Sequence, residues 1–227
     1  MIADVPHLLK NLRNAWMNFD FILSDEVVKN NSLPSNRVSK SAVRQLILFQ
    51  EKNAFLLQSR LKIDHLQMTN SFAKMRVQPA EAVFSHSTAA AIRTLVKKYD
   101  FDKSFMTTAF FIEKVATWYE RLTSREKVMA FSYKRMDKFQ EAMQDLKEFM
   151  DIIDTTILSK TLFEGQKARI PIQRGIVLTT TSMMDIIVKL LDLGFAYVEG
   201  GKFTSEPVEN VFACVRRRTL APTRKNF

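Results

Sequence analysis

The sequence is poor in cysteine and in long apolar runs. Its one cysteine, Cys214, excludes a disulfide-stapled scaffold and is typical of a reducing compartment. No apolar run approaches the roughly 20 residues that a membrane-spanning helix needs, and the N-terminus lacks the layout of a signal peptide. These absences predict a soluble, intracellular protein.

Glycine and proline are scarce in the first two thirds of the chain. All five glycines follow residue 164, and the prolines before that point are Pro6, Pro34 and Pro79. Because neither residue is well tolerated inside a helix, this stretch is predicted to be mostly helical.

Positive charge is what the sequence has in excess. Its 34 lysines and arginines outnumber 24 aspartates and glutamates, which gives a formal net charge of +10. Such a surplus favours a polyanionic partner, because each phosphate contact releases condensed counterions. A basic surface without a specific partner explains the same charge, so composition leaves both interpretations open.

The clearest periodic element runs from about Glu126 to Ser159. Apolar residues recur there in alternating steps of three and four, at Met136, Phe139, Met143, Leu146, Met150, Ile153 and Ile157. This spacing predicts a helix with a narrow apolar seam. An internal helix packed within its own domain is the favoured interpretation, and a coiled coil with a partner chain is the alternative.

Periodicity and capping residues predict the other elements. Before the seam we expect helices over 42–61 with a break near Asn53, over 80–99 after Pro79, and over 105–123 with Ser104 as N-cap. After Gly165 we expect an extended segment over 170–179, a helix over 182–193 stopped by Gly194, a hairpin over 195–204, and a last helix capped by Ser205. Residues 16–38 are expected to form an irregular connection.

The opening stretch carries the strongest local signal. Asp4 is followed by a proline that begins a helix, and Leu8, Leu9 and Leu12 share one face of that helix. Read from these residues alone, Asp4 is a helix N-cap. The alternative is a carboxylate at a strand-to-helix junction that binds a divalent ion, because hard cations prefer oxygen ligands.

Four stretches resemble P-element-type transposases and their THAP-type relatives, and they occur in family order over nearly the whole chain. The first is the Asp-x-Pro-His-Leu-x-Lys-x-x-Arg-Asn pattern that begins at Asp4. The second begins with Lys-Met-Arg-Val at Lys74, and the third runs from Phe111 to Arg125. The fourth is Glu-Pro-Val-Glu-Asn-Val-Phe at 206–212.

The resemblance implies a mainly α chain in which incomplete pieces of an RNase H-like α/β core, at 1–38 and 204–227, flank a helical insertion domain at 39–203. The two flanking pieces should meet in space. Three carboxylates of that family hold two Mg²⁺ ions for phosphodiester chemistry, and Asp4 and Glu209 match the second and third of them. The first should lie well upstream of Asp4, so we expect no DNA cleavage by this chain alone.

The insertion domain of that family binds GTP without a P-loop, and the sequence has no P-loop pattern either. The resemblance assigns nucleotide contacts to Arg76, Val77, Tyr119, Glu120, Thr123 and Glu206. Glu120 and Glu206 stand where the family has aspartate, and Thr123 stands where it has asparagine. Because a glutamate carries its carboxylate one methylene further out, GTP binding is expected to be weak or absent. In the alternative, Tyr119 is helix core and Glu120 is a solvated charge.

The resemblance also implies a DNA partner and a nuclear location. The predicted phosphate contacts are Lys10, Arg13 and the run Arg216-Arg217-Arg218. A second copy of the chain or an upstream transposase segment is a further candidate partner. Two functions stay open: a truncated or domesticated transposase segment that binds DNA, and a helical protein-interaction module of transposase ancestry.

Overall fold

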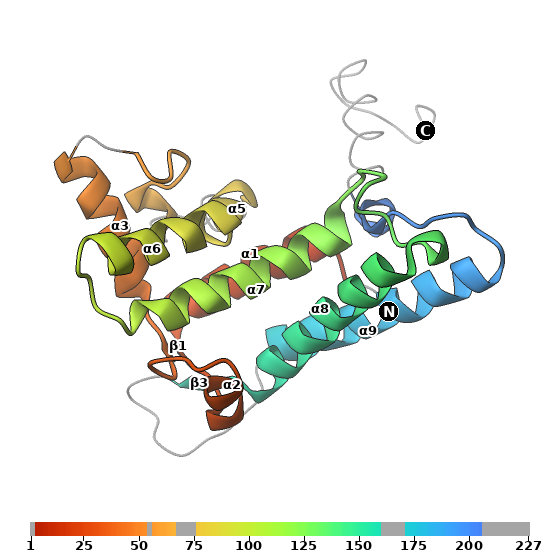
Figure 1. The fold of residues 1–227 in the computed structure, drawn as a ribbon, viewed down its shortest axis with the longest axis horizontal. Coiled ribbons are helices and arrows are strands. Elements are labelled where there is room, and N and C mark those ends of the chain that lie inside the picture. Colours follow the sequence, from red (N-terminus) through yellow and green to blue (C-terminus); the bar gives the residue numbers. More distant parts are fainter. Residues whose placement is uncertain (1–2, 54–55, 67–75, 160–170, 206–227) are drawn as a thin grey trace, which may run out of the picture.

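The computed structural model describes residues 3–53, 56–66, 76–159 and 171–205 (Figure 1). These residues are mainly helical, as predicted, with one small three-stranded sheet. Their buried apolar side chains form one core cluster. None of the helices in these ranges combines the length and the apolar character that crossing a membrane requires.

Helix α1 (Val5–Asn18) begins where the sequence predicts a helix, with Pro6 in its first turn. Leu8, Leu9 and Leu12 are buried on one face, as their spacing predicts. This face packs against α7 (Phe105–Thr123) and α9 (Pro171–Asp192), and α1 runs alongside α7 in Figure 1. The N-terminal segment is therefore part of the core.

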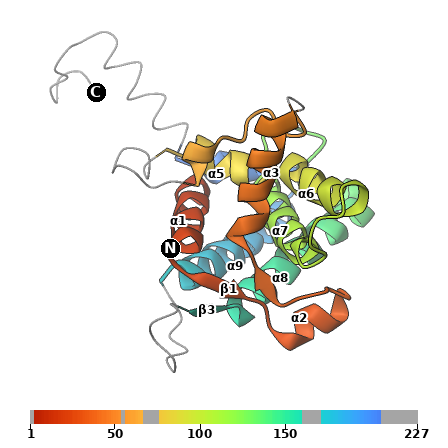
Figure 2. The same cartoon turned by 90° about the vertical axis from the view of Figure 1, so that its left-hand side faces the viewer.

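The prediction of an irregular connection over 16–38 is wrong for most of that range. Strands β1 (Asp20–Ile22) and β2 (Arg37–Val38) pair in antiparallel orientation, and the short helix α2 (Asp25–Asn30) lies between them in the sequence. Strand β3 (Ile157–Ser159) completes the sheet in the order β2-β1-β3. Figure 2 shows α2 beside the sheet, away from α5 (Gln78–Val83). The strands are too short to show a period, so their pairing is decided by tertiary contacts such as Phe21 against Phe111, whose ring centroids lie 5.7 Å apart.

Helix α3 (Lys40–Asn53) ends at Asn53, where the sequence predicts a break, and the short 3-10 helix η1 (Ile63–His65) follows. The helix predicted over 80–99 is in fact two, α5 (Gln78–Val83) and α6 (His86–Lys98). Ser85 causes the break because its backbone is extended and its hydroxyl accepts a hydrogen bond from the Thr88 backbone amide at 3.2 Å.

Helix α7 is the central helix, and its bounds match the prediction. Its buried residues include Phe105, Ala109, Ile112 and Val115, which the sequence places on the inner face. The predicted capping role of Ser104 is wrong, because Ser104 has helical backbone angles and its side chain makes no capping hydrogen bond. The Asp102 carboxylate instead accepts a hydrogen bond from the Ser104 amide at 2.8 Å.

Helix α8 (Met136–Thr155) is shorter than the predicted helix at both ends, because 3-10 helix η2 (Tyr133–Arg135) precedes it and β3 follows. Of the predicted seam, Met143, Leu146 and Ile153 are buried. Phe149 and Ile152 are buried as well, so the apolar face is wider than a coiled-coil seam. This face packs against α7 and α9, which confirms the internal helix and gives no support to a coiled coil with a partner.

The prediction of an extended segment over 170–179 is wrong, because α9 begins at Pro171 and is 22 residues long. Proline suits the first position of a helix. Ile172, Ile176 and Thr180 lie on the same face of α9 and are buried in the core. The predicted stop at Gly194, with φ of +93°, is confirmed. The predicted hairpin is wrong, since residues Gly200–Phe203 form 3-10 helix η3 and Val198 pairs with Phe131 in an isolated antiparallel bridge.

Candidate nucleotide-binding site

The C-terminal end of α7 brings three of the predicted nucleotide contacts together. Tyr119, Glu120 and Thr123 lie in its last two turns, and α6 and η3 pack against the helix. A helix C-terminus carries partial negative charge on its free carbonyls, which suits a ligand that donates hydrogen bonds.

Tyr119 connects this end of α7 to α5. Its hydroxyl donates a hydrogen bond to Glu81 Oε1 at 2.6 Å. Arg76, which is exposed, and Val77 directly precede α5, with Val77 at its N-cap position. The structure therefore places the predicted Arg76–Val77 pair one helix turn from a residue that contacts Tyr119.

Glu120 points to α6, where its Oε2 lies 3.3 Å from His86 Nε2. Half of each side chain is exposed, so the pair lies at the surface and is well solvated. Thr123, one turn later, donates its hydroxyl to the Tyr119 carbonyl at 2.7 Å. Both residues thus have protein partners that a guanine base would have to share.

Two glycines let η3 approach the end of α7 closely. A Cβ atom on Gly201 would lie 2.3 Å from the Thr123 carbonyl oxygen, and one on Gly200 would lie 2.5 Å from that of Arg121. The Gly201 amide donates to the Ser124 carbonyl at 3.0 Å. Helix η3 is therefore held against the last turn of α7.

A pocket of about 740 Å³ borders this arrangement. It lies between the 56–66 segment and α5, and it shares Glu81 with the Tyr119 contact. Arg60 and Lys62 line it from one side, and Ser85, the N-cap of α6, lines it from the other. Ligand pockets commonly span 300–1,000 Å³, so the volume accommodates a nucleotide.

Asp4 is at the N-cap position of α1, but its side chain does not cap that helix. Its Oδ1 accepts a hydrogen bond from the Ser205 backbone amide at 2.8 Å, and its Oδ2 pairs with His7 Nδ1. Partial burial raises the pKa of the Asp4 carboxyl, but the hydrogen bonds from Ser205 and His7 outweigh burial and hold that pKa below its usual value. The two ends of the described chain, at Asp4 and Ser205, therefore meet in space.

The described residues alone do not form the Mg²⁺ site that the family resemblance implies. Both carboxylate oxygens of Asp4 are engaged by protein groups, and no three His, Cys, Asp or Glu side chains gather within the described ranges. Glu209, the other predicted ligand, lies outside those ranges, as do the predicted contacts Glu206, Arg216, Arg217 and Arg218.

The two predicted DNA contacts on α1 differ in their exposure. Lys10 is partly exposed, whereas Arg13 is 1% exposed and donates a hydrogen bond to Asn14 Oδ1 at 3.0 Å. Burial lowers the pKa of the Arg13 guanidinium. Because its guanidinium lies in the core, the prediction that Arg13 contacts DNA phosphates does not fit the folded chain.

Sequence reasoning missed Glu81, His86 and the role of the glycine pair. Gly200 and Gly201 lie within the hairpin expected over 195–204, and the isolated His86 has no metal-ligand spacing in the sequence. The Glu81–Tyr119 and His86–Glu120 contacts each join residues that are more than 30 positions apart in the chain. The adjacent glycines were the one local signal, since two glycines together also permit close backbone approach.

Comparison with known proteins identifies relatives of this chain. Residues 6–136 match the family described as TNP-like, GTP-binding insertion domain. The chain is 23% identical over 224 residues to a Transposable element P transposase of Drosophila melanogaster, and the match covers 96% of this chain and 27% of the relative.

A solved structure shares the fold. It is the Drosophila P element transposase strand transfer complex, which matches with a TM-score of 0.74 and 21% identity over 99% of this chain and 49% of that chain. The chain therefore spans about a quarter of the length of the curated relative and about half of the chain in the solved structure.

Proposed function

Because this chain belongs to the family of TNP-like, GTP-binding insertion domains, we propose that it binds a guanine nucleotide that spans the C-terminal end of α7 and the adjoining 740 Å³ pocket beside α5. The chain would do so as part of a P-element-type transposase that binds DNA. The observation that carries the proposal is the convergence of α5, α6, α7 and η3 around the predicted contact residues.

The base end of the nucleotide is assigned to the end of α7. Guanine presents donors at N1 and N2, and a carboxylate is the side chain that accepts from both. Glu120 supplies that carboxylate, and Tyr119 supplies an aromatic ring next to it. Glu120 is also in contact with His86, so binding guanine weakens or replaces an existing ion pair.

The phosphate end is assigned to the cationic side of the pocket. Arg60 and Lys62 line it, and Ser85 marks the N-terminus of the 13-residue helix α6. Lysine and arginine charges together with a helix N-terminus stabilise phosphate groups. Arg76 is exposed just before α5, the helix that lines the pocket with Gln78 and Glu81.

We predict selective but weak binding of GTP. Isothermal titration should give a Kd weaker than ~1 µM for GTP, because Glu120 is longer than the family's aspartate and already engaged by His86, and no measurable binding for ATP. Glu120→Gln should weaken GTP binding about tenfold, the cost of about one hydrogen bond to a charged group. Glu120→Asp combined with Thr123→Asn should tighten it by a similar factor.

The matched control is Glu51→Gln, which makes the same charge change at an exposed position of α3. It should leave GTP binding unchanged. Submicromolar GTP binding by the unaltered chain would show that the two substitutions do not weaken the site, and equal affinity for ATP would remove Glu120 as the guanine acceptor.

The DNA-binding part of the proposal rests on the net charge of +10 and on Arg216 to Arg218. If the chain neutralises three or four phosphates, log Kobs should fall with log salt concentration at a slope of about −3. The variant in which Arg216, Arg217 and Arg218 are all glutamine should have a shallower slope and lower affinity at every salt concentration. Retention that is insensitive to salt would contradict phosphate binding and favour the protein-interaction module.

A further inference from the structure

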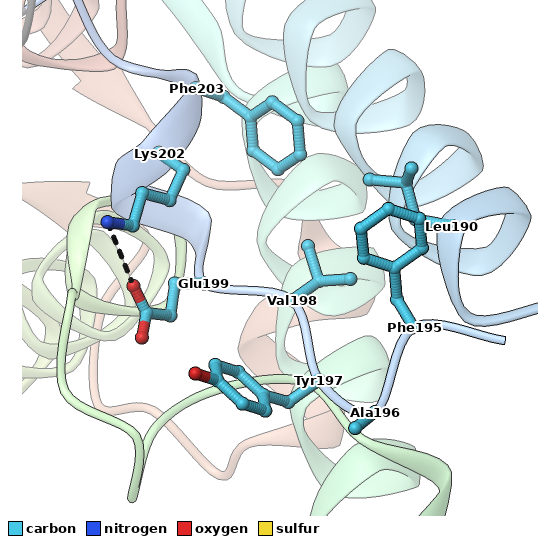
Figure 3. Close-up of a pocket in the computed structure, with 8 residues that line it drawn as sticks. All are labelled: Leu190, Phe195, Ala196, Tyr197, Val198, Glu199, Lys202 and Phe203. Carbon is cyan, nitrogen blue, oxygen red and sulfur yellow. Dashed lines mark ion pairs between the residues drawn. The ribbon is translucent and has the colours of Figure 1, made fainter.

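A second pocket, of about 490 Å³, lies between the end of α9 and η3, and aromatic rings form its walls. Figure 3 shows Val198 between the three rings, with Phe203 above it, Phe195 to its right and Tyr197 below it. Phe195 is 57% exposed and Tyr197 is 42% exposed, which is unusual for side chains of this size. The rings flank a space that none of the described side chains fills.

The segment that carries these rings is held firmly by other parts of the chain. Gly194 ends α9, and the Phe195 amide donates to the Leu190 carbonyl at 3.1 Å, which fixes where the segment leaves the helix. Val198 and Phe131 exchange backbone hydrogen bonds of 2.9 Å, and Ser132 donates its hydroxyl to the Ala196 carbonyl at 2.6 Å. The backbone that carries the exposed rings is therefore preorganised, so little backbone entropy is lost when a ligand contacts them.

The charges that line the pocket itself, Lys202 and Glu199, balance, and the segment beside it carries the positive surplus. The loop over residues 125–135 has four basic residues and one acidic residue, and the Phe131–Val198 bridge holds it beside the aromatic segment. Lys127 Nζ lies 5.7 Å from the centre of the Tyr197 ring. Lys202 is 67% exposed and pairs with Glu199 at 3.6 Å, as Figure 3 shows. Arg135 donates to three carbonyls of the loop and so keeps Lys127 in place.

We propose that this pocket takes an unstacked base of single-stranded DNA. Flat aromatic side chains stack on any base, and the neighbouring lysines attract the phosphates on either side of it. A protein partner would find the same rings, but the net positive charge of the neighbouring 125–135 segment favours a polyanion. The inference deepens the DNA-binding part of the proposed function and rests on it, because it assigns a single-strand contact that the glutamine variants of Arg216 to Arg218 do not remove.

The test compares three fluorescent probes by anisotropy with the full chain: a thymidine oligonucleotide, the same oligonucleotide with abasic sites, and a duplex of equal length. The thymidine strand should bind more tightly than the abasic strand. Phe195→Ala and Tyr197→Ala should each weaken thymidine-strand binding about tenfold and leave abasic and duplex binding unchanged, as expected for a lost stacking contact. Phe195→Trp should retain binding, because it keeps a flat aromatic ring.

Leu193→Ala is the matched control, since Leu193 is 77% exposed and adjacent in sequence but does not line the pocket. It should leave all three affinities unchanged. If the abasic strand binds as well as the thymidine strand, or if the aromatic substitutions change only the oligomeric state, the pocket does not bind a base, while duplex retention still supports the proposed function. If none of the three probes binds, this inference and the DNA-binding part of the proposed function are both wrong.

Discussion

Trp118→Ala should lower the free energy of unfolding by about 4 kcal/mol, in the range found when a large buried aromatic is truncated. Trp118 is fully buried in α7, and its ring stacks on Phe149 of α8 with centroids 5.0 Å apart. Its indole Nε1 donates to Thr180 Oγ1 of α9 at 2.9 Å. One side chain therefore joins three helices, and its removal leaves both a cavity and an unpaired hydroxyl.

Urea denaturation followed by circular dichroism measures this effect without relying on the tryptophan itself. Leu178→Ala on α9 is the control, because Leu178 is 59% exposed and should change stability by less than about 0.5 kcal/mol. The hydrogen bond can be separated from the packing by a double-mutant cycle of Trp118→Phe and Thr180→Val. A loss below about 1 kcal/mol for Trp118→Ala would mean that α7, α8 and α9 do not pack as described.

Gly201→Ala should destabilise the chain by roughly 1–3 kcal/mol and abolish GTP binding. The added methyl would lie 2.3 Å from the Thr123 carbonyl oxygen. That atom belongs to the backbone and cannot rotate away, so η3 and the last turn of α7 must separate. Glu120 and Thr123 lie in that turn, and the proposed guanine contacts should move with it.

Gly175→Ala provides the matched glycine control. Gly175 is inside α9, and its added methyl would meet the Leu8 Cδ2 atom at 3.2 Å, which belongs to a flexible side chain. Replacing glycine by alanine inside a helix contributes up to about 1 kcal/mol of stability, which should offset the small adjustment. Thermal unfolding and GTP titration of both variants check the contrast. A Gly201→Ala protein with unaltered stability and GTP binding would contradict the close contact between η3 and α7.

Local sequence signals predicted the helices that have both a clear apolar period and a distinct end. Pro6 begins α1, Asn53 ends α3, and Gly194 ends α9, and each acts through the backbone of its own segment. The same signals failed where a stretch of sequence is compatible with either a strand or a helix. The β-branched stretch after Ile170 has strand propensity, but packing against α1 and α8 makes it the first half of α9.

In the candidate site, too, the sequence identified individual residues but not their distant partners. The resemblance to P-element-type transposases named Tyr119, Glu120 and Thr123, and their places in α7 follow from the helical period. The partners of these residues could not be predicted, because Glu81 and His86 reach α7 across more than 30 residues of chain. From the sequence, Asp4 is predicted to cap the helix that follows it. In the structure its carboxylate instead accepts a hydrogen bond from the distant Ser205 amide.

The sequence by itself determined the mainly helical fold, the relation to transposases and the positive charge, because these depend on composition, period and motif. Tertiary structure alone decided the three-stranded sheet, the burial of Arg13 and the meeting of the chain's described ends. It also placed the pocket beside α5 and the aromatic pocket beside η3. These features arise from contacts between segments that are distant in the sequence. The free energy of such contacts depends on shape and burial in the folded chain, so they produce no periodic pattern in the sequence.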